Sequence, residues 1–287
     1  MLLEAEAAAE KGAYQRSSIV ARSMSVTIRY FTDPACSWSW STEPTVRKLM
    51  VEFGENLRWT FVMAGLARDY TSGHASLVRE WLDVADEGRM PLDPRLWTEG
   101  PIKSTYPACM AVKAAAEQAA DGGYGYLRRL REGLFCFRRK LDTTEALVEE
   151  ARGAKLDVER FRIDLASHAI VEAFGDDLEE TRTADGGEPA GLPSAVLVGE
   201  DGARHGLFGV KSYEDYAAAA EAAGASRTEE RPSIEQALRR FGRMAGREIE
   251  AVCDLPEPRA QAELWRMASE WQVKPTRVLT GYLLELS

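Results

Sequence analysis

Residues 26–40, VTIRYFTDPACSWSW, decide the fold of this chain. The first six, VTIRYF, are rich in β-branched and aromatic side chains, and the run stops at Asp33-Pro34, where proline cannot continue a strand. Residues 41–54, STEPTVRKLMVEFG, then carry apolar side chains at helical spacing and end at a glycine. The sequence therefore predicts a buried strand, a short loop that holds Cys36, and a helix that begins close behind this cysteine.

The elements that follow extend this unit into a larger α/β fold. Residues 57–63, LRWTFVM, are typical of a second strand, which a strand-helix-strand connection makes parallel to the first. From about residue 76 to residue 183 the pattern is almost wholly helical. Strand character returns at residues 194–198 and 204–210, which predict a hairpin, and a helix with Ser212 as its N-cap follows and ends at Gly224.

A polar linker at residues 225–232 separates a small C-terminal unit. Ser233 and Gln236 have the spacing of a capping box, which predicts a helix start. A turn at residues 254–256 and a terminal strand complete the outline of a small winged helix. Between them lies an amphipathic helix whose apolar face we expect to carry Leu264, Met267 and Trp271.

The charge of the chain excludes some classes of partner. With 46 acidic and 36 basic residues the net charge is −10, which argues against a nucleic-acid track or an anionic membrane surface. No apolar run approaches the roughly 20 residues that span a bilayer, and the opening residues are acidic where a secretory signal is basic and then apolar. We therefore expect a cytoplasmic protein with reduced cysteines, no membrane partner and no nucleic-acid partner.

Cys36 is the cysteine with a distinctive position. It lies between a strand end and a helix start, where backbone N–H groups and the helix dipole favour a thiolate and lower the pKa of the thiol. The alternative is that Cys36 is a small buried hydrophobic residue, as free cysteines often are. Trp38 and Trp40 flank the thiol, and two interpretations remain open. Either they form an apolar contact patch for a client polypeptide, or one of them packs the start of the helix onto the helical segment.

The sequence DPACSWSW at residues 33–40, with Glu43-Pro44 behind it, resembles the D-P-x-C-x-x-C-W active site of DsbA-like thioredoxin-fold proteins. This family includes the FrnE-like and 2-hydroxychromene-2-carboxylate isomerase-like group. Within it the chain most resembles the YjbH/SpxH branch of ClpXP adaptors. Three segments resemble the helical insert of that branch in order and spacing: PIKSTYPACMAVKAAA at residues 101–116, LRRLREGLF and AFGDDLEE.

The resemblance implies a set of site residues. Pro193 stands where the family carries a cis-proline beside the active-site cysteine, and Leu192 and Ser194 flank it as substrate-binding positions, together with Trp38 and Trp40. Ser39 replaces the resolving cysteine, so Cys36 can attack a disulfide but cannot close an internal one within the motif. This C-x-x-S site implies a monothiol cycle, in which Cys36 is the nucleophile, Ser39 hydrogen-bonds its thiolate, and glutathione or a second external thiol resolves the mixed disulfide.

The other cysteines and the histidines each have an interpretation as ordinary core or surface residues. Cys109 is either a displaced resolving cysteine or a core residue, because a disulfide needs Cα atoms within about 7 Å. We interpret Cys136 and Cys253 as core residues. His74, His168 and His205 are isolated in the sequence, without metal-ligand spacing, and no glycine-rich phosphate loop has the required context. The sequence therefore predicts no metal and no cofactor, with glutathione as the one co-substrate considered.

We expect an N-terminal extension at residues 1–23, a thioredoxin-like domain at 24–75 and 184–224, an inserted helical domain at 76–183, and a winged-helix-like unit at 233–287. The first hypothesis for function is a protein related to DsbA-like thiol-disulfide oxidoreductases, with a client protein or a low-molecular-weight thiol as partner. The second is a non-enzymatic adaptor that delivers a transcription regulator to the ClpXP protease. A third is a glutathione-dependent isomerase, which needs a glutathione site beside Ser39 and Pro193. For the C-terminal unit, mixed charges favour a protein contact over DNA.

Overall fold

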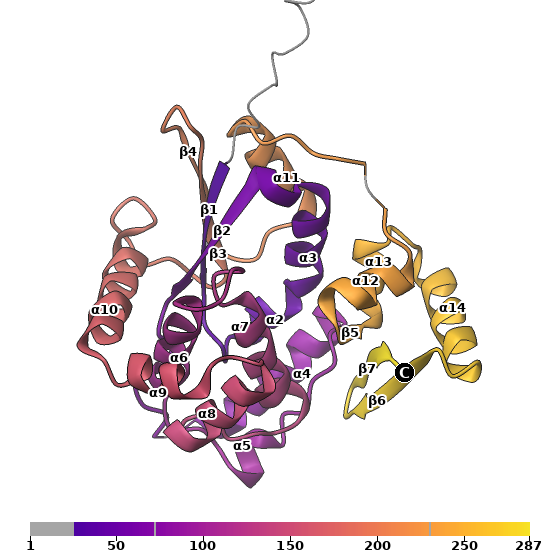
Figure 1. Ribbon diagram of the computed structural model, residues 1–287, viewed down its shortest axis with the longest axis horizontal. Coiled ribbons are helices and arrows are strands. Elements are labelled where there is room, and N and C mark those ends of the chain that lie inside the picture. The colour runs from indigo at the N-terminus through magenta and orange to yellow at the C-terminus, as the bar shows by residue number, and fades with distance from the viewer. Residues whose placement is uncertain (1–25, 72, 230) are drawn as a thin grey trace, which may run out of the picture.

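The computed structural model describes residues 26–71, 73–229 and 231–287 (Figure 1). The expected N-terminal extension at residues 1–23 lies outside the described residues. Three parts are visible: a central sheet with flanking helices, a block of helices below it, and a smaller unit at one side (Figure 1).

The central sheet has four strands in the order β2-β1-β3-β4. Strand β1 (Val26–Thr32) pairs in parallel with β2 (Leu57–Met63) and antiparallel with β3 (Ser194–Val198). Strand β4 (Arg204–Leu207) pairs antiparallel with β3 and closes the hairpin. It ends three residues before the expected boundary, since the chain turns at Gly209, where φ is 75°. The strand order and directions are those of the expected thioredoxin-like fold.

Helices cover both faces of this sheet (Figure 1). Helices α2 (Ser37–Ser41) and α3 (Glu43–Glu52) follow β1, and the short helix η1 (Gly54–Asn56) leads into β2. Helix α11 (Tyr213–Ala222) packs beside α3, and a capping box formed by Ser212 and Asp215 begins it. Helix α10 (His168–Thr183) lies on the opposite side and contacts β2.

The segment between β2 and β3 forms the helical insert, which begins at His74, two residues before the expected boundary. Its core is continuous with that of the sheet: Trp81, Trp97 and Phe135 belong to the same buried cluster as Tyr30 and Phe61. The insert therefore shares one hydrophobic core with the thioredoxin-like part. Besides α10, its helices are α4 (His74–Gly88), α5 (Leu96–Glu99), α6 (Tyr106–Ala116), α7 (Tyr124–Arg131), the π-helical turn η2 (Glu132–Cys136), α8 (Thr144–Gly153) and α9 (Val158–Leu165).

The C-terminal unit has its own small core and a three-stranded sheet in the order β5-β7-β6. The predicted single terminal strand is instead a hairpin, and a short strand before the second helix joins it. The order of helices and strands is that of a winged helix. Its elements are α12 (Ile234–Phe241), β5 (Met244–Ala245), α13 (Gly246–Val252), α14 (Glu257–Ser269), β6 (Val273–Val278) and β7 (Gly281–Leu286).

One prediction for this unit is wrong. Leu264 and Met267 are buried, but Trp271 is 85% exposed. Helix α14 ends at Ser269 and the backbone at Trp271 is left-handed, with φ of 58°, so this side chain leaves the helical face that the spacing assumed.

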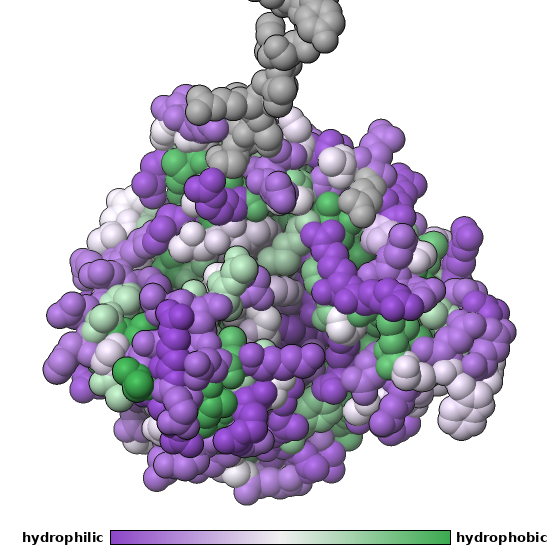
Figure 2. Space-filling view, viewed as in Figure 1, coloured by the Kyte–Doolittle hydropathy of each residue, from purple (hydrophilic) through white to green (hydrophobic). Residues whose placement is uncertain are grey.

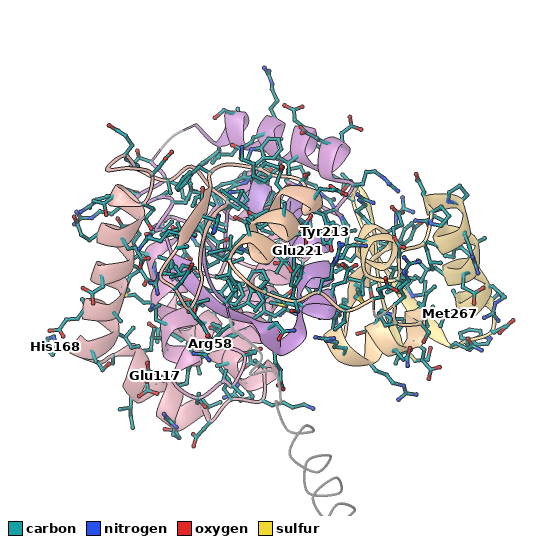
Figure 3. The ribbon with its side chains drawn as sticks, turned by 90° about the horizontal axis from the view of Figure 1, so that it is seen from above. Arg58, Glu117, His168, Tyr213, Glu221 and Met267 are labelled. Carbon is teal, nitrogen blue, oxygen red and sulfur yellow. The ribbon has the colours of Figure 1, made fainter. Side chains whose placement is uncertain are left out.

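Seen from above, Met267 of this unit and His168 of α10 lie at opposite ends of the molecule (Figure 3).

The surface is dominated by polar residues, with small hydrophobic patches between them on the face shown in Figure 2. Among the described residues, no helix combines the length and the apolar character that crossing a bilayer requires.

Candidate functional site

Cys36 is the N-cap of α2, immediately after the loop that leaves β1. Its backbone is extended, and its sulfur accepts a hydrogen bond from the Ser39 N–H at 3.4 Å. The strand-loop-helix position inferred from the sequence is thus the observed one. The helix that it caps is only five residues long, because Thr42 separates α2 from α3.

Asp33 organises the loop around this cysteine. One carboxylate oxygen accepts a hydrogen bond from the Ala35 N–H at 2.8 Å. The other accepts from the Leu66 N–H at 2.7 Å and from the Cys109 thiol at 3.2 Å. A buried carboxylate therefore connects the loop before Cys36 to the end of β2 and to helix α6.

The Cys36 thiol is buried, with 4% of the residue exposed, and it is a free thiol. Burial raises its pKa above the ordinary cysteine value, and the negative charge of Asp33 adds to the rise. Ser39, and more weakly Arg131, lower the pKa but do not offset the burial. The direction is opposite to the thiolate-favouring environment that the sequence suggested, because desolvation outweighs one backbone N–H of a very short helix.

A cavity of about 490 Å³ opens beside Cys36. Trp38 and Leu192 line it together with Leu66 and Tyr70 from the loop after β2 and Trp81 from α4. The Leu192-Pro193 peptide bond is cis. One carboxylate, Glu80, also lines the cavity, and it accepts a hydrogen bond from the Ser37 hydroxyl at 2.6 Å. The cavity is thus mainly apolar and aromatic, and Cys36 forms part of its wall.

Trp40, the other predicted substrate-binding tryptophan, does not line this cavity. The side chain is fully buried, and its indole N–H donates to the Pro91 carbonyl at 3.0 Å. It stacks on Phe135 with ring centroids 5.5 Å apart, and the Arg128 guanidinium lies 4.4 Å from its ring centroid. Of the two tryptophans, Trp40 packs α2 onto the insert and Trp38 lines the cavity.

Three further predicted site residues, Ser39, Pro193 and Ser194, are buried in the structure. Ser39 and Ser194 are fully buried, and Pro193 is buried between Leu192 and β3. The Ser194 hydroxyl donates to the Gly191 carbonyl and accepts from the Gly209 N–H at 3.0 Å, so it holds the cis-proline loop. None of the three lines the cavity.

The remaining cysteines are free and buried. Cys109 donates to Asp33, and burial followed by the Asp33 charge raises its pKa well above the ordinary value. In the structure it supports the loop and forms no disulfide with Cys36. Cys136 lies in the main core and Cys253 in the C-terminal core, as expected.

A buried ionic network, which the sequence analysis did not predict, lies where the three parts meet. Glu43 of α3 is fully buried, pairs with Arg131, and accepts a hydrogen bond from the Tyr124 hydroxyl at 2.7 Å. Glu248 of α13 is also fully buried, 2.8 Å from Arg128 of α7. The runs LRRLRE and GREIE contain Arg128, Arg131 and Glu248, but only the three-dimensional fold shows which charges are paired.

This network has Arg47 of α3 at its centre. Its guanidinium lies 3.1 Å from Glu248 and donates to the Tyr124 hydroxyl at 3.0 Å. The positive partners around Glu43 hold the pKa of that carboxyl below its usual value despite its burial. Within residues 26–71, 73–229 and 231–287, no group of three histidine, cysteine or acidic side chains is placed to hold a metal ion.

Comparison with known proteins gives a consistent picture. The thioredoxin family model matches residues 30–219. The ClpXP adapter protein SpxH of Halalkalibacterium halodurans is 31% identical over 250 residues, which are 83% of this chain and 81% of the relative. The ClpXP adapter protein SpxH of Bacillus subtilis is 29% identical over 249 residues, which are 84% of this chain and 82% of that protein.

Solved structures of DsbA-like proteins share the fold. The cytosolic disulfide reductase DsbM from Pseudomonas aeruginosa superimposes with a TM-score of 0.56 at 20% identity, over 69% of this chain and 94% of that one. The same protein with GSH gives a TM-score of 0.54 at 18% identity, over 69% and 95% of the two chains. These matches confirm the DsbA-like thioredoxin fold.

Proposed function

Because the chain belongs to the thioredoxin family, and to the same family as the ClpXP adapter proteins SpxH, we propose that it is an adaptor. In this role it binds a client protein, for which a transcription regulator is the leading class, and presents it to a ClpXP-type protease. The fold is that of DsbA-like thiol-disulfide oxidoreductases, and the chemistry of that fold is not needed for the proposed role.

The observation that carries this proposal is the state of Cys36. A nucleophilic cysteine requires an accessible thiolate, whereas this thiol is 4% exposed and its pKa is raised by burial. Ser39 occupies the position of a resolving cysteine, and Cys109 is engaged with Asp33. The site therefore lacks the two features of a dithiol cycle, an accessible thiolate and a resolving cysteine. It retains a cavity, which is the part of the fold that binding requires.

The cavity beside Cys36 is the proposed client-binding surface. Trp38 and Leu66 supply exposed apolar area at its mouth, with Leu66 48% exposed. Aromatic and aliphatic side chains in a concave site are the usual anchors for a polypeptide segment. Glu80 adds one negative charge near the mouth, so the preferred client segment is apolar and carries no acidic residue at that point.

A second candidate function keeps the thiol in use. Cys36 lines a cavity, and a protein of the same fold has been solved with GSH, which supports a small thiol as the occupant of this cavity. In that cycle Cys36 attacks a disulfide, forms a mixed disulfide and releases one thiol. An external thiol such as glutathione then attacks the substrate sulfur of the mixed disulfide, which frees Cys36 and removes the second substrate sulfur as a disulfide with that external thiol. The isomerase hypothesis has less support, since Ser39 and Pro193 do not line the cavity.

Protein half-lives in the organism that carries the gene test the adaptor proposal. Deleting the gene should lengthen the half-lives of a small set of proteins, measured by pulse labelling and mass spectrometry. Deleting the gene in a strain that lacks ClpX should lengthen them no further, because adaptor and protease act in one pathway. If no protein is stabilised, or if the two deletions add, the adaptor proposal is wrong.

A further inference from the structure

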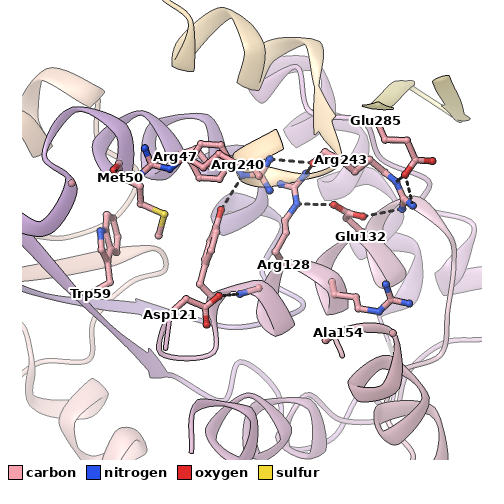
Figure 4. A pocket seen from close by; sticks show the side chains of 16 residues that line it. Arg47, Met50, Trp59, Asp121, Arg128, Glu132, Ala154, Arg240, Arg243 and Glu285 are labelled. Carbon is pink, nitrogen blue, oxygen red and sulfur yellow. Dashed lines mark hydrogen bonds and ion pairs between the residues drawn. The ribbon is translucent and has the colours of Figure 1, made fainter. Parts of the chain in front are cut away.

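A second cavity, of about 560 Å³, lies where the three parts of the molecule meet (Figure 4). Arg47 and Met50 of α3 line it from the thioredoxin-like part, and Arg128 and Arg129 of α7 line it from the insert. Arg240, the next-to-last residue of α12, lines it from the C-terminal unit. Its volume lies in the range of about 300–1,000 Å³ that is usual for small-molecule sites, and it is separate from the cavity that contains Cys36.

The carboxylates that line this cavity are already used by the protein. Asp121 accepts hydrogen bonds from the N–H groups of Gly123 and Gly125 at 3.0 and 2.7 Å. Glu132 pairs with Arg128 at 2.9 Å and with Arg243 at 3.0 Å. Glu285, the third acidic lining residue, pairs with the same Arg243, at 3.2 Å. Each lining acid therefore has partners within the protein: a cation for Glu132 and Glu285, and two backbone N–H groups for Asp121.

Two of the lining arginines retain unused donors. Arg240 donates one hydrogen bond, to the Met50 carbonyl at 2.7 Å, and forms no ion pair in the described part of the chain. Arg129 approaches Glu150 at 2.7 Å through Nε, and Glu150 is shared with Arg139. A guanidinium has five N–H donors, so the terminal nitrogens of both residues have donors to spare. The cavity thus offers positive charge and donors without matching acceptors.

One wall of the cavity is apolar and aromatic. Trp59 and Met50 lie on one side of it, opposite Glu132 and Arg243 (Figure 4). Phe241 also lines it and is contacted by two cations, with the guanidinium carbons of Arg47 and Arg240 at 5.0 and 5.2 Å from its ring centroid. A planar ring has an apolar surface to pack against here, and an anionic group has arginine donors in the same cavity.

We propose that this cavity is a binding site for a small anionic ligand that carries an aromatic ring, with Arg240 and Arg129 as its charge-recognising residues. The anionic group, a carboxylate or a phosphate, bonds to the free guanidinium nitrogens, and the ring packs against Trp59 and Met50. Such a ligand touches all three parts of the molecule at once, so its binding favours the docked position of the C-terminal unit. This site is independent of the Cys36 cavity and of the adaptor proposal.

Isothermal titration of the full chain tests the proposal with three anions: adenosine diphosphate, indole-3-acetate and inorganic phosphate. Adenosine and indole serve as uncharged counterparts. At least one of the two ring-bearing anions should bind, and its uncharged counterpart should not. The first two anions separate a phosphate source from a carboxylate source, and binding of inorganic phosphate alone would overturn the role of the aromatic wall.

The matched variants are Arg240→Gln and Arg239→Gln. Arg239 is the preceding residue of the same helix, pairs with Glu235, and does not line the cavity. Loss of one charge-assisted hydrogen bond should weaken binding by roughly tenfold or more in Arg240→Gln and leave Arg239→Gln unchanged. Both substitutions change exposed residues of α12, and circular dichroism verifies the fold. Absence of binding by both ring-bearing anions, or equal affinity in the two variants, would overturn the proposal.

Discussion

The Cys109 thiol donates a hydrogen bond to the Asp33 carboxylate at 3.2 Å, and this contact defines the state of the Cys36 loop. Asp33 also accepts from the Ala35 N–H, so the cysteine on α6 and the loop before Cys36 are joined through one carboxylate. A cysteine that is held in this way supports the pocket, and the negative charge beside it disfavours both thiolates.

Replacing Asp33 by asparagine should make Cys36 more reactive. The Asp33 charge raises the pKa of Cys36, so removing it lowers this pKa and increases the thiolate fraction at any pH below it. Mass spectrometry of the Cys36 peptide after timed iodoacetamide treatment at pH 8 should show faster alkylation in Asp33→Asn than in the wild type. The control is Asp69→Asn, at an exposed position in the loop after β2. Equal rates in all three proteins would contradict the role given to Asp33.

Glu248 should be essential for holding the C-terminal unit against the other two parts of the molecule. It is fully buried and pairs with Arg47 and Arg128, so Glu248→Gln leaves buried guanidinium charge without compensation. Loss of one partner from a buried pair costs about 3–5 kcal/mol, measured as the free energy of unfolding in urea. Glu263→Gln removes a surface carboxylate that pairs with Arg266 and should lower the free energy of unfolding far less, because solvent screens an exposed pair. Similar values for the two variants would contradict the network.

Trp40 is expected to act as a core residue. Trp40→Ala removes a fully buried side chain that stacks on Phe135 and should lower the free energy of unfolding by about 3–5 kcal/mol. Trp271→Ala truncates a tryptophan that is 85% exposed and should change it by about 0.5 kcal/mol or less. Both values come from denaturant titrations followed by circular dichroism. If Trp40→Ala changed the free energy of unfolding as little as Trp271→Ala does, the core role of Trp40 would be contradicted.

A charge at the mouth of the Cys36 cavity should impair client binding. Leu66 is 48% exposed and lines this cavity, so Leu66→Asp places a carboxylate in the proposed apolar contact. The proteins stabilised by gene deletion should remain stabilised in a strain that expresses this variant. Ile163→Asp, at an exposed position of α9 outside the cavity, should restore normal half-lives. Full restoration by Leu66→Asp would exclude this cavity as the client surface.

Much of the fold followed from local patterns. Strands β1 and β2, the position of Cys36 between strand and helix, the hairpin of β3 and β4, and the caps at Ser212 and Ser233 all depend on neighbouring residues, and the sequence contains that information. Trp38 and Trp40 show where this local information is no longer sufficient. They are two apart on one short helix, and only the packing of Phe135 against this helix decides which one is buried.

The electrostatics of the site could not be predicted for a related reason. Position alone suggested an activated thiol, but the pKa of Cys36 depends on how much of the insert covers it and on the buried charge of Asp33. The network around Glu43 and Glu248 joins residues as far apart in the sequence as Arg47 and Glu248, and no sequence period connects them. Trp271 was misplaced because its left-handed backbone interrupts the helical spacing that placed it.

The most direct test of the adaptor account is the half-life of the stabilised proteins in a deletion strain that expresses the Cys36→Ser variant. The serine hydroxyl fits the buried site and cannot attack a disulfide, so the variant separates the thiol from the pocket. We expect Cys36→Ser to restore the half-lives as fully as the wild-type chain does. If the variant folds and accumulates normally but the proteins stay stabilised, the Cys36 thiol is required and the adaptor account is contradicted.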